Sequence, residues 1–305
     1  MSEAARRQAL GTADQREDPH LVGLAISDLL QQNRLTAHRH ESTGRLAWYT
    51  NPGTADAVVA PRLALIAPLY ARVSGDGFGN LTGDALEIVV WKCLDAVYAE
   101  NRRYPYQGHF DIHPPKNEHG RYRRTQPAKS LNGKNSVGEA DFLQFGFDAG
   151  PLCIECKNYR EWLYPHHPVI KELIIKAAEI DAIPVMIARR LHYTTRSNFL
   201  EPAGIIAHES LFQYYPIEHA DLAERVKNAR LLGFTDVTAS EEPHPRTQRF
   251  FNELLPRVVD HMAKRWFANR TELVAYARGD INLAQLYTEI DSPAGGKWDD
   301  QTPPF

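Results

Sequence analysis

Two charged residues, Glu155 and Lys157, interrupt an apolar run at 152–159 that reads LCIECKNY. A run of this kind is typical of a buried strand, where a charged side chain is costly unless it has a partner or a chemical use. Because side chains alternate across a strand, Glu155 and Lys157 are expected on one face together with Cys153, while the residues between them face the core. The sequence therefore predicts a carboxylate and an ammonium side by side on a rigid strand.

Two further acids precede this strand. The segment VGEADFLQFGF at 137–147 is predicted to form a strand, and Glu139 and Asp141 share one of its faces. The short turn DAGP joins it to the LCIECKNY strand as a hairpin, so the charged faces of the two strands converge at one end. Asp141 and Glu155 are expected to meet there beside the ammonium, and Glu139 is a candidate ligand of a second metal ion.

Such a cluster suits one kind of chemistry. Carboxylates packed together raise each other's pKa, and a divalent cation offsets the repulsion. Mg²⁺ takes a few carboxylate oxygens and keeps several waters, so it leaves room for phosphate oxygens. The ion polarises a phosphodiester and lowers the pKa of its bound water, while an adjacent ammonium orients that water or stabilises charge on the phosphate. The pattern therefore predicts metal-assisted hydrolysis of phosphodiester bonds.

The segments GEADFLQF and CIECKN resemble the PD-(D/E)XK nuclease superfamily, which has the restriction-endonuclease-like fold. That family places an Asp on one strand and Glu-x-Lys on the next, and Asp141, Glu155 and Lys157 match these positions. Many members add an acid from the helix before the sheet, and Glu87 in GDALEIVVWK fits that place. Alanine precedes Asp141 where the family name implies proline. The resemblance covers residues 80–210.

The resemblance implies a Mg²⁺-dependent endonuclease in which Mn²⁺ substitutes and DNA is the expected substrate. Asp141, Glu155 and Glu87 are then metal ligands. Lys157 completes the catalytic set as the residue that positions the attacking water or neutralises charge. The implied setting is restriction, defence or repair. Because cutting both strands of a duplex normally needs two active sites, a homodimer is expected, or else a partner protein that supplies regulation.

Three alternatives stay open for the same residues. One is a cross-strand salt bridge on an exposed sheet face, with no chemistry attached. Another is a nucleic-acid-binding scaffold whose nuclease fold is idle, and the third is a nuclease directed at RNA. A zinc site at Cys153 and Cys156 is disfavoured, because no second pair of ligands exists and strand alternation separates the two thiols.

The polar, turn-rich segment at 114–136 is predicted to be a long loop. Within it, RYRRTQPAKSLNGK at 121–134 carries five cations and no acid. The segment is either a solvated loop or an arm that contacts phosphates beside the active site. Its candidate nucleic-acid contacts are Arg121, Arg123, Arg124, Lys129 and Lys134.

The elements that position these residues predict an α/β fold, with a mixed sheet flanked by helices. Lys171 and Lys176 lie on the helix expected after the hairpin, and Lys171 is interpreted as a surface lysine. That helix permits a right-handed crossover to the next strand. The expected elements are helices at 61–72 and 80–100, a strand at 109–113, the hairpin, a helix at 167–182, strands at 183–190 and 203–209, and helices from 216 onward.

The N-terminal part reads as a helix at 19–35 followed by a hairpin at 36–53 around the turn ESTG, which resembles the recognition helix and wing of a winged-helix module. A full three-helix unit would need a further short helix at 4–10, and the alternative is a helix-hairpin that packs on the main domain. The predicted organisation is an N-terminal helix-hairpin region at 1–75, a nuclease core at 76–215, a helical C-terminal region at 216–290 and a loose tail at 291–305.

Composition bounds the remaining choices. The 305 residues suffice for one sizeable core or two modest ones, and the net charge of −3 means that nucleic acid would have to meet a local basic patch. Three cysteines argue against a disulfide framework and favour a reducing cytoplasm. The N-terminus lacks the apolar segment of a signal peptide, and no run approaches the ~18 apolar residues of a membrane span. A cytoplasmic protein without a membrane partner is expected.

Overall fold

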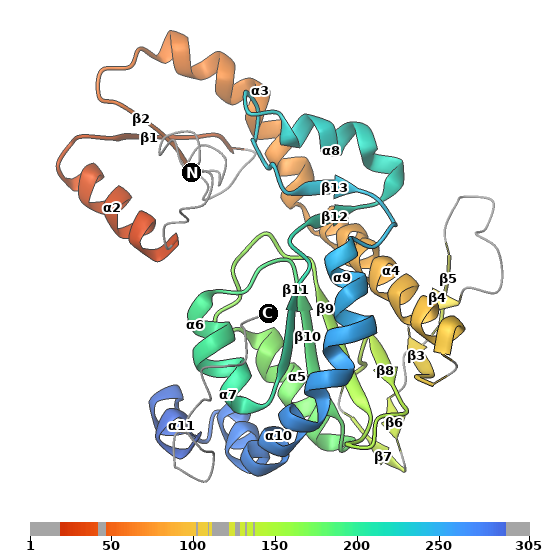
Figure 1. Cartoon of the computed structure of the whole chain (residues 1–305). Coiled ribbons are helices and arrows are strands. Elements are labelled where there is room, and N and C mark those ends of the chain that lie inside the picture. Colours follow the sequence, from red (N-terminus) through yellow and green to blue (C-terminus); the bar gives the residue numbers. More distant parts are fainter. Residues whose placement is uncertain are drawn as a thin grey trace. The chain divides into compact units, whose positions relative to one another are not determined.

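The computed structural model describes residues 19–41, 47–101, 103–108, 110–111, 122–125, 129–131, 133–136 and 138–290. Figure 1 shows the chain coloured along its sequence. The chain divides into two compact units, each built from two segments. The first unit comprises Met1–Thr82 and Tyr215–Ala239, and the second comprises Gly83–Tyr214 and Ser240–Phe305.

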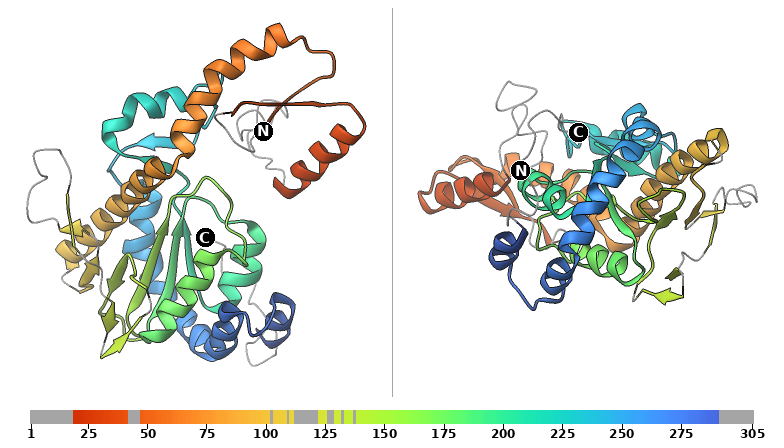
Figure 2. Two further views of the ribbon diagram at one scale, coloured as in Figure 1. Left: turned by 180° about the vertical axis from the view of Figure 1, so that it is seen from behind. Right: turned by 60° about the horizontal axis from the view of Figure 1, so that its bottom comes forward.

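A five-stranded mixed sheet forms the centre of the second unit, with strand order β11-β10-β9-β8-β3 (Figure 1, and from behind in Figure 2). Its strands β3 and β8 are antiparallel, as are β8 and β9, whereas β9, β10 and β11 are parallel. This confirms the predicted α/β class with a mixed sheet. The strands are β3 (Tyr106–Gly108), β8 (Phe142–Gln144), β9 (Leu152–Lys157), β10 (Ile183–Ala188) and β11 (Ile206–Glu209).

Helix α5 (Pro168–Glu179) connects β9 to β10, as the sequence predicts. It begins where Pro168 fixes a helical φ and where the ring of His167 accepts a hydrogen bond from the Val169 amide at 3.3 Å. Its buried stripe includes Ile170 and Leu173. The helix therefore has one apolar face, which it buries against β9 and β10.

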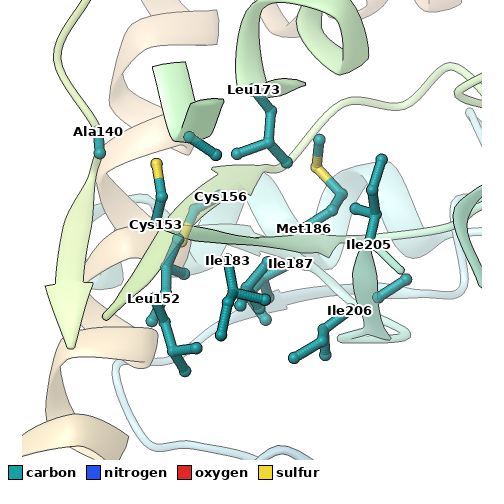
Figure 3. Close-up of a cluster of buried hydrophobic side chains, with 14 of the residues drawn as sticks. Ala140, Leu152, Cys153, Cys156, Leu173, Ile183, Met186, Ile187, Ile205 and Ile206 are labelled. Atoms are coloured by element: carbon teal, nitrogen blue, oxygen red, sulfur yellow. The ribbon is translucent and has the colours of Figure 1, made fainter. Parts of the chain in front are cut away.

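Apolar side chains cover both faces of this sheet. Figure 3 shows Cys153 and Met186 on the side where Leu173 of α5 lies, while Ile183 and Ile187 point to the opposite side. Cys153 is fully buried. The face that carries Cys153 is therefore buried as well as the face of Ile154 and Cys156, because parallel strands with a crossover helix are covered on both sides.

The C-terminal helices join the same core. They are α9 (Pro245–Arg249), α10 (Leu255–Arg278) and α11 (Leu283–Ile290), and a short π-helical stretch lies between α9 and α10. Trp266 of α10 is fully buried in the cluster that contains the sheet residues. At Gly204, with φ of 78°, a Cβ would lie 2.2 Å from the Trp266 amide nitrogen, so only glycine allows this approach.

Helix α4 (Asp76–Asn101) matches the helix expected at 80–100, and its residues from Gly83 belong to the second unit. The strand predicted at 137–147 is shorter, since β8 covers only three residues and Gly146, with φ of 91°, turns the chain. The segment predicted as a loop contains the short strands β5 (Arg123–Arg124), β6 (Ser130–Leu131) and β7 (Lys134–Asn135) where it is described. β5 pairs with β4 (Phe110–Asp111), which lies within the strand predicted at 109–113, and Arg124 lies over the Phe110 ring.

The first unit contains the predicted helix and hairpin. Helix α2 (Pro19–Gln31) is followed by β1 (Thr36–Arg39) and β2 (Ala47–Thr50), which pair antiparallel. The further helix considered at 4–10 lies outside the described residues. The remaining elements of the unit are α3 (Asp56–Ser74), α8 (Ala220–Lys227) and β13 (Val237–Ala239), and β12 (Gln213–Tyr215) leads into it from the second unit.

A separate apolar cluster holds the first unit together. Phe78 packs edge-on against Tyr215, with ring centroids 4.8 Å apart, and Leu222, Val226 and Val237 are among the other buried members of the cluster. Residues 216–239 belong to this unit because α8 and β13 contribute to this cluster, although the sequence grouped them with the C-terminal helices.

Helix α3 is long and apolar enough to cross a membrane by length and composition, with a mean hydropathy of 1.3 and 17% of that window buried. Its sequence is not an unbroken apolar run, because Pro61, Arg62 and Pro68 interrupt it. One such helix is weak evidence for a span.

Candidate active site

The register of the β8–β9 hairpin brings the two predicted acids together. Leu143 lies opposite Cys153 and Phe142 opposite Ile154, so the next position places Asp141 beside Glu155. The amide of Cys156 donates a hydrogen bond to Asp141 Oδ2 at 2.6 Å. The side chain of Asp141 is thus tied to the neighbouring strand that carries Glu155.

Lys157 completes the group that the spacing predicted. Its Nζ lies 2.5 Å from Glu155 Oε1 and 3.9 Å from Asp141 Oδ2. Asp141 and Glu155 are 6% and 4% exposed, whereas the Lys157 side chain keeps 17% exposure. Lys157 therefore has the most exposed side chain of the three residues.

Lys176 of α5 contributes a second ammonium, which sequence reasoning missed. Its Nζ lies 3.2 Å from Glu155 Oε2 and 3.4 Å from Oε1. A Cβ on Gly138 would lie 2.7 Å from Lys176 Cε, so the glycine leaves space for the lysine. The available signal was the position of Lys176 on α5, between the buried residues Leu173 and Ala177.

Lys171, one turn earlier on α5, does not reach the acids. Its Nζ lies 4.7 Å from the centre of the Tyr276 ring, in a cation–π contact with α10.

Glu87 approaches the site from α4. It is 7% exposed, and its charge contributes to the raised pKa of Asp141. Arg124 lies 3.9 Å from Glu87 and 3.0 Å from Asp84, so one residue of the cationic segment reaches the edge of the site. Glu139 is instead ion-paired with Lys129 at 2.7 Å.

Burial and neighbouring charges shift the pKa values of Asp141 and Lys157. Burial, reinforced by Glu155 and Glu87, raises the pKa of Asp141 from 3.8 to about 7, although Lys157 and the Cys156 amide oppose the shift. Burial alone would lower the pKa of Lys157, but the carboxylates of Asp141 and Glu155 outweigh it and raise the pKa above 10.5. At neutral pH the site therefore holds a charged lysine and an acid that titrates.

The donors are of the chemical type that a hard divalent cation prefers. Asp141, Glu155 and Glu87 offer carboxylate oxygens, which Mg²⁺ and Mn²⁺ prefer. The nearby thiols of Cys153 and Cys156 are fully buried with raised pKa values, so they stay protonated and do not act as soft ligands. Cation binding would relieve the charge repulsion that raises the pKa of Asp141.

The described residues hold no cluster of three or more His, Cys, Asp or Glu side chains arranged to hold a metal ion. Two ammonium groups accompany the acids instead, from Lys157 and Lys176. An incoming cation would therefore compete with these lysines for Glu155.

The predicted nucleic-acid contacts lie mostly in ion pairs. Besides Arg124 and Lys129, Lys134 pairs with Asp181, and Arg270 of α10 pairs with the same acid at 2.7 Å. Arg123 is exposed in β5, and Arg121 lies outside the described residues. Acids elsewhere in the fold thus neutralise part of the segment's positive charge.

Three comparisons with known proteins give no match. No family model matches the sequence. No curated protein matches it, and no solved structure matches its fold. The geometry by itself supports an α/β protein with a buried carboxylate pair at the β8–β9 hairpin. Lys157 of β9 and Lys176 of α5 pair with one of these carboxylates.

Proposed function

We propose that this protein is a Mg²⁺-dependent nuclease that hydrolyses phosphodiester bonds, with DNA as its expected substrate. The observation that carries the proposal is the meeting of Asp141, Glu155 and Lys157 on adjacent strands. A buried carboxylate pair of this kind is costly without a counter-charge, and such sites are commonly functional.

The order of elements supports the restriction-endonuclease-like fold as part of the same proposal. A helix with an acid, a strand entered by an Asp, a strand ending in Glu-x-Lys, a crossover helix and a parallel strand occur as α4, β8, β9, α5 and β10. This is the order that the resemblance of the sequence implies. The expected setting in restriction, defence or repair, and a homodimer for duplex cutting, follow from that resemblance.

The roles of the residues follow from their chemistry. Asp141 and Glu155 would hold the cation, with Glu87 as a third carboxylate. The bound cation supplies charge for the phosphate and a water of lowered pKa. Lys157 stays protonated because of its raised pKa, so it serves as a charged donor to the phosphate or to the attacking water, not as a base.

The test is cleavage of plasmid and single-stranded DNA in Mg²⁺, Mn²⁺ or EDTA. Wild type should cut with either metal ion and not in EDTA. Asp141→Ala and Lys157→Ala should each reduce cutting by at least about a hundredfold while circular dichroism stays unchanged. The control is Glu253→Ala, which removes an exposed acid from an (i,i+4) pair. Full cutting by either site variant contradicts the assignment.

A binding scaffold with an idle site is the second candidate. The observation that favours it is the pairing of Glu155 with both Lys157 and Lys176, which already balances its charge. Binding of DNA without cutting in every metal condition would support the scaffold. Cutting of RNA and not of DNA in the same assay would support a nuclease directed at RNA.

A further inference from the structure

An exposed aromatic residue follows the proposed catalytic strand directly. Tyr159 lies two residues after Lys157, and its side chain is 44% exposed. Tyr159 lies close enough to Lys157 for the two side chains to interact electrostatically. An apolar ring beside a charged catalytic group is left in contact with solvent.

The backbone that carries Tyr159 is held from two sides by buried polar groups. Asn158, 4% exposed, donates from Nδ2 to the Tyr214 carbonyl at 2.6 Å and accepts from the Tyr214 amide at 3.1 Å. Arg189, 1% exposed, donates from Nε to the Tyr159 carbonyl at 3.0 Å and from Nη2 to the Arg160 carbonyl at 2.6 Å. Two buried side chains thus fix the backbone around Tyr159, which limits the ordering cost when its ring contacts a ligand.

Further rings line the same loop and the loop after β10. The ring of Tyr159 lies 6.0 Å from that of His167, and Tyr164 stacks on His166 at 5.9 Å and 13°. Tyr164 also stacks on His192 at 4.9 Å. Trp162 meets His192 edge-on at 5.6 Å. These loops follow the carboxyl ends of the parallel strands β9 and β10, where open α/β sheets bind ligands.

We propose that Tyr159, at the exposed edge of these rings, forms a stacking platform for unpaired nucleobases, so the substrate class of the proposed site is single-stranded nucleic acid. The inference rests on the proposed function and names its substrate. A base placed on Tyr159 would put its flanking phosphate near Lys157. Bases inside a duplex have both faces covered by their neighbours, so an exposed ring selects a base that is unstacked.

The ordinary alternative is that the rings only pack against one another. That account suits Tyr164 and His192, which cover each other and of which His192 is buried. It does not suit Tyr159, whose 44% exposure leaves ring surface uncovered. Stacking on an aromatic side chain is tolerant of sequence because every base has a π-face.

The test is binding of fluorescein-labelled oligo(dT), oligo(rU) and a duplex of equal length to the full chain in EDTA, followed by fluorescence anisotropy. Tyr159→Ala and Tyr159→Leu should weaken single-strand binding roughly tenfold, since each loses the stacking face. Tyr159→Phe should restore binding to within about twofold. Phe267→Ala is the control, because Phe267 is a 42% exposed ring on α10.

The outcomes separate this inference from the proposed function, because binding in EDTA requires no cleavage. Loss of either the DNA or the RNA single strand on Tyr159→Ala supports the platform, even if the wild type cuts nothing. Unchanged single-strand binding in both Tyr159→Ala and Tyr159→Leu overturns the platform, even if the wild type is an active nuclease. Equal weakening of duplex binding by Tyr159→Ala also overturns it.

Discussion

Lys176 contacts Glu155 in addition to Lys157, with its Nζ 3.2 Å from Glu155 Oε2. The contact joins a crossover helix to the strand it follows, 21 residues apart in sequence. It places a second positive charge on the carboxylate proposed to bind the cation. If the proposed cation binds to Glu155, Lys176 competes with it, and removal of Lys176 should change the metal affinity.

Lys176→Met should tighten Mg²⁺ binding about fivefold, because a competing charge within ion-pair distance is lost. Isothermal titration with Mg²⁺ or Mn²⁺ measures the change. Lys171→Met is the matched control on the same helix, since Lys171 contacts the Tyr276 ring and not the acids. Equal or weaker metal binding by Lys176→Met would show that Lys176 supports the site and does not compete.

Asp141 makes the stability of the metal-free protein depend on pH, and the direction of the change can be predicted. Its folded pKa of about 7 lies above the unfolded value of 3.8, so the folded state holds the proton longer and stability falls as pH rises between these values. Asp141→Asn should raise the free energy of unfolding in EDTA by ~2 kcal/mol at pH 8 and by less at pH 5. Urea unfolding measures both.

The same unfolding measurements can be repeated with Mg²⁺. It should stabilise the wild type at pH 8 more than at pH 5, because the ligand must be deprotonated, and it should have little effect on Asp141→Asn. An Asp141→Asn variant that is less stable than the wild type at pH 8 in EDTA would contradict the raised pKa.

Glu87 offers a test of the helix acid. Glu87→Gln should lower cleavage by at least about tenfold if its carboxylate helps hold the cation, while the fold is kept. Asp84→Asn is the control, because Asp84 lies on the same helix and shares the same partner, Arg124. Cleavage rates of plasmid and of single-stranded DNA at saturating Mg²⁺ measure the difference. Equal losses of cleavage in both variants would mean that the loss comes from their shared partner, Arg124, and not from a missing metal ligand.

The buried residue His208 predicts how the stability of the protein changes at acid pH. Burial, with the positive charges of Arg246 and Arg196, lowers its pKa from 6.5 to about 3, and its ring stacks on Phe250 at 4.4 Å. The folded state keeps His208 neutral, so stability is lost as pH falls from 6.5 towards 3, by up to ~1.4 kcal/mol per pH unit.

His208→Gln removes this titration and should flatten the fall in stability between pH 6 and 4. Urea unfolding at several pH values measures the slope for both proteins. Identical slopes would show that His208 is already protonated, or solvated, in the folded state.

Substitution of Gly204 tests how closely α10 packs against this position. Gly204→Ala places a Cβ 2.2 Å from the Trp266 backbone nitrogen at φ of 78°, so we expect a loss of at least ~3 kcal/mol in unfolding free energy. Gly279→Ala is matched in φ, at 90°, but its Cβ meets nothing within 4 Å and should cost only ~1 kcal/mol. Thermal unfolding compares the two. Similar losses would mean that α10 shifts to admit the methyl group.

The charged residues of the hairpin could be found from sequence because their arrangement is local. Strand alternation and a short turn are enough to bring Asp141, Glu155 and Lys157 together, and the hydrophobic period is enough to place Glu87 on a helix. The α/β class followed from the same local periods, since β10 and α5 differ clearly in pattern.

Tertiary structure alone decided which distant side chains share an environment. Lys176 reaches Glu155 only after α5 docks on the sheet, and Lys134 meets Asp181 across 47 residues. The same holds for the grouping of residues 216–239 with the first unit, and for the buried Arg189 that holds the loop of Tyr159. Local periods report which face of an element is apolar, whereas the partner of that face depends on how all the elements pack.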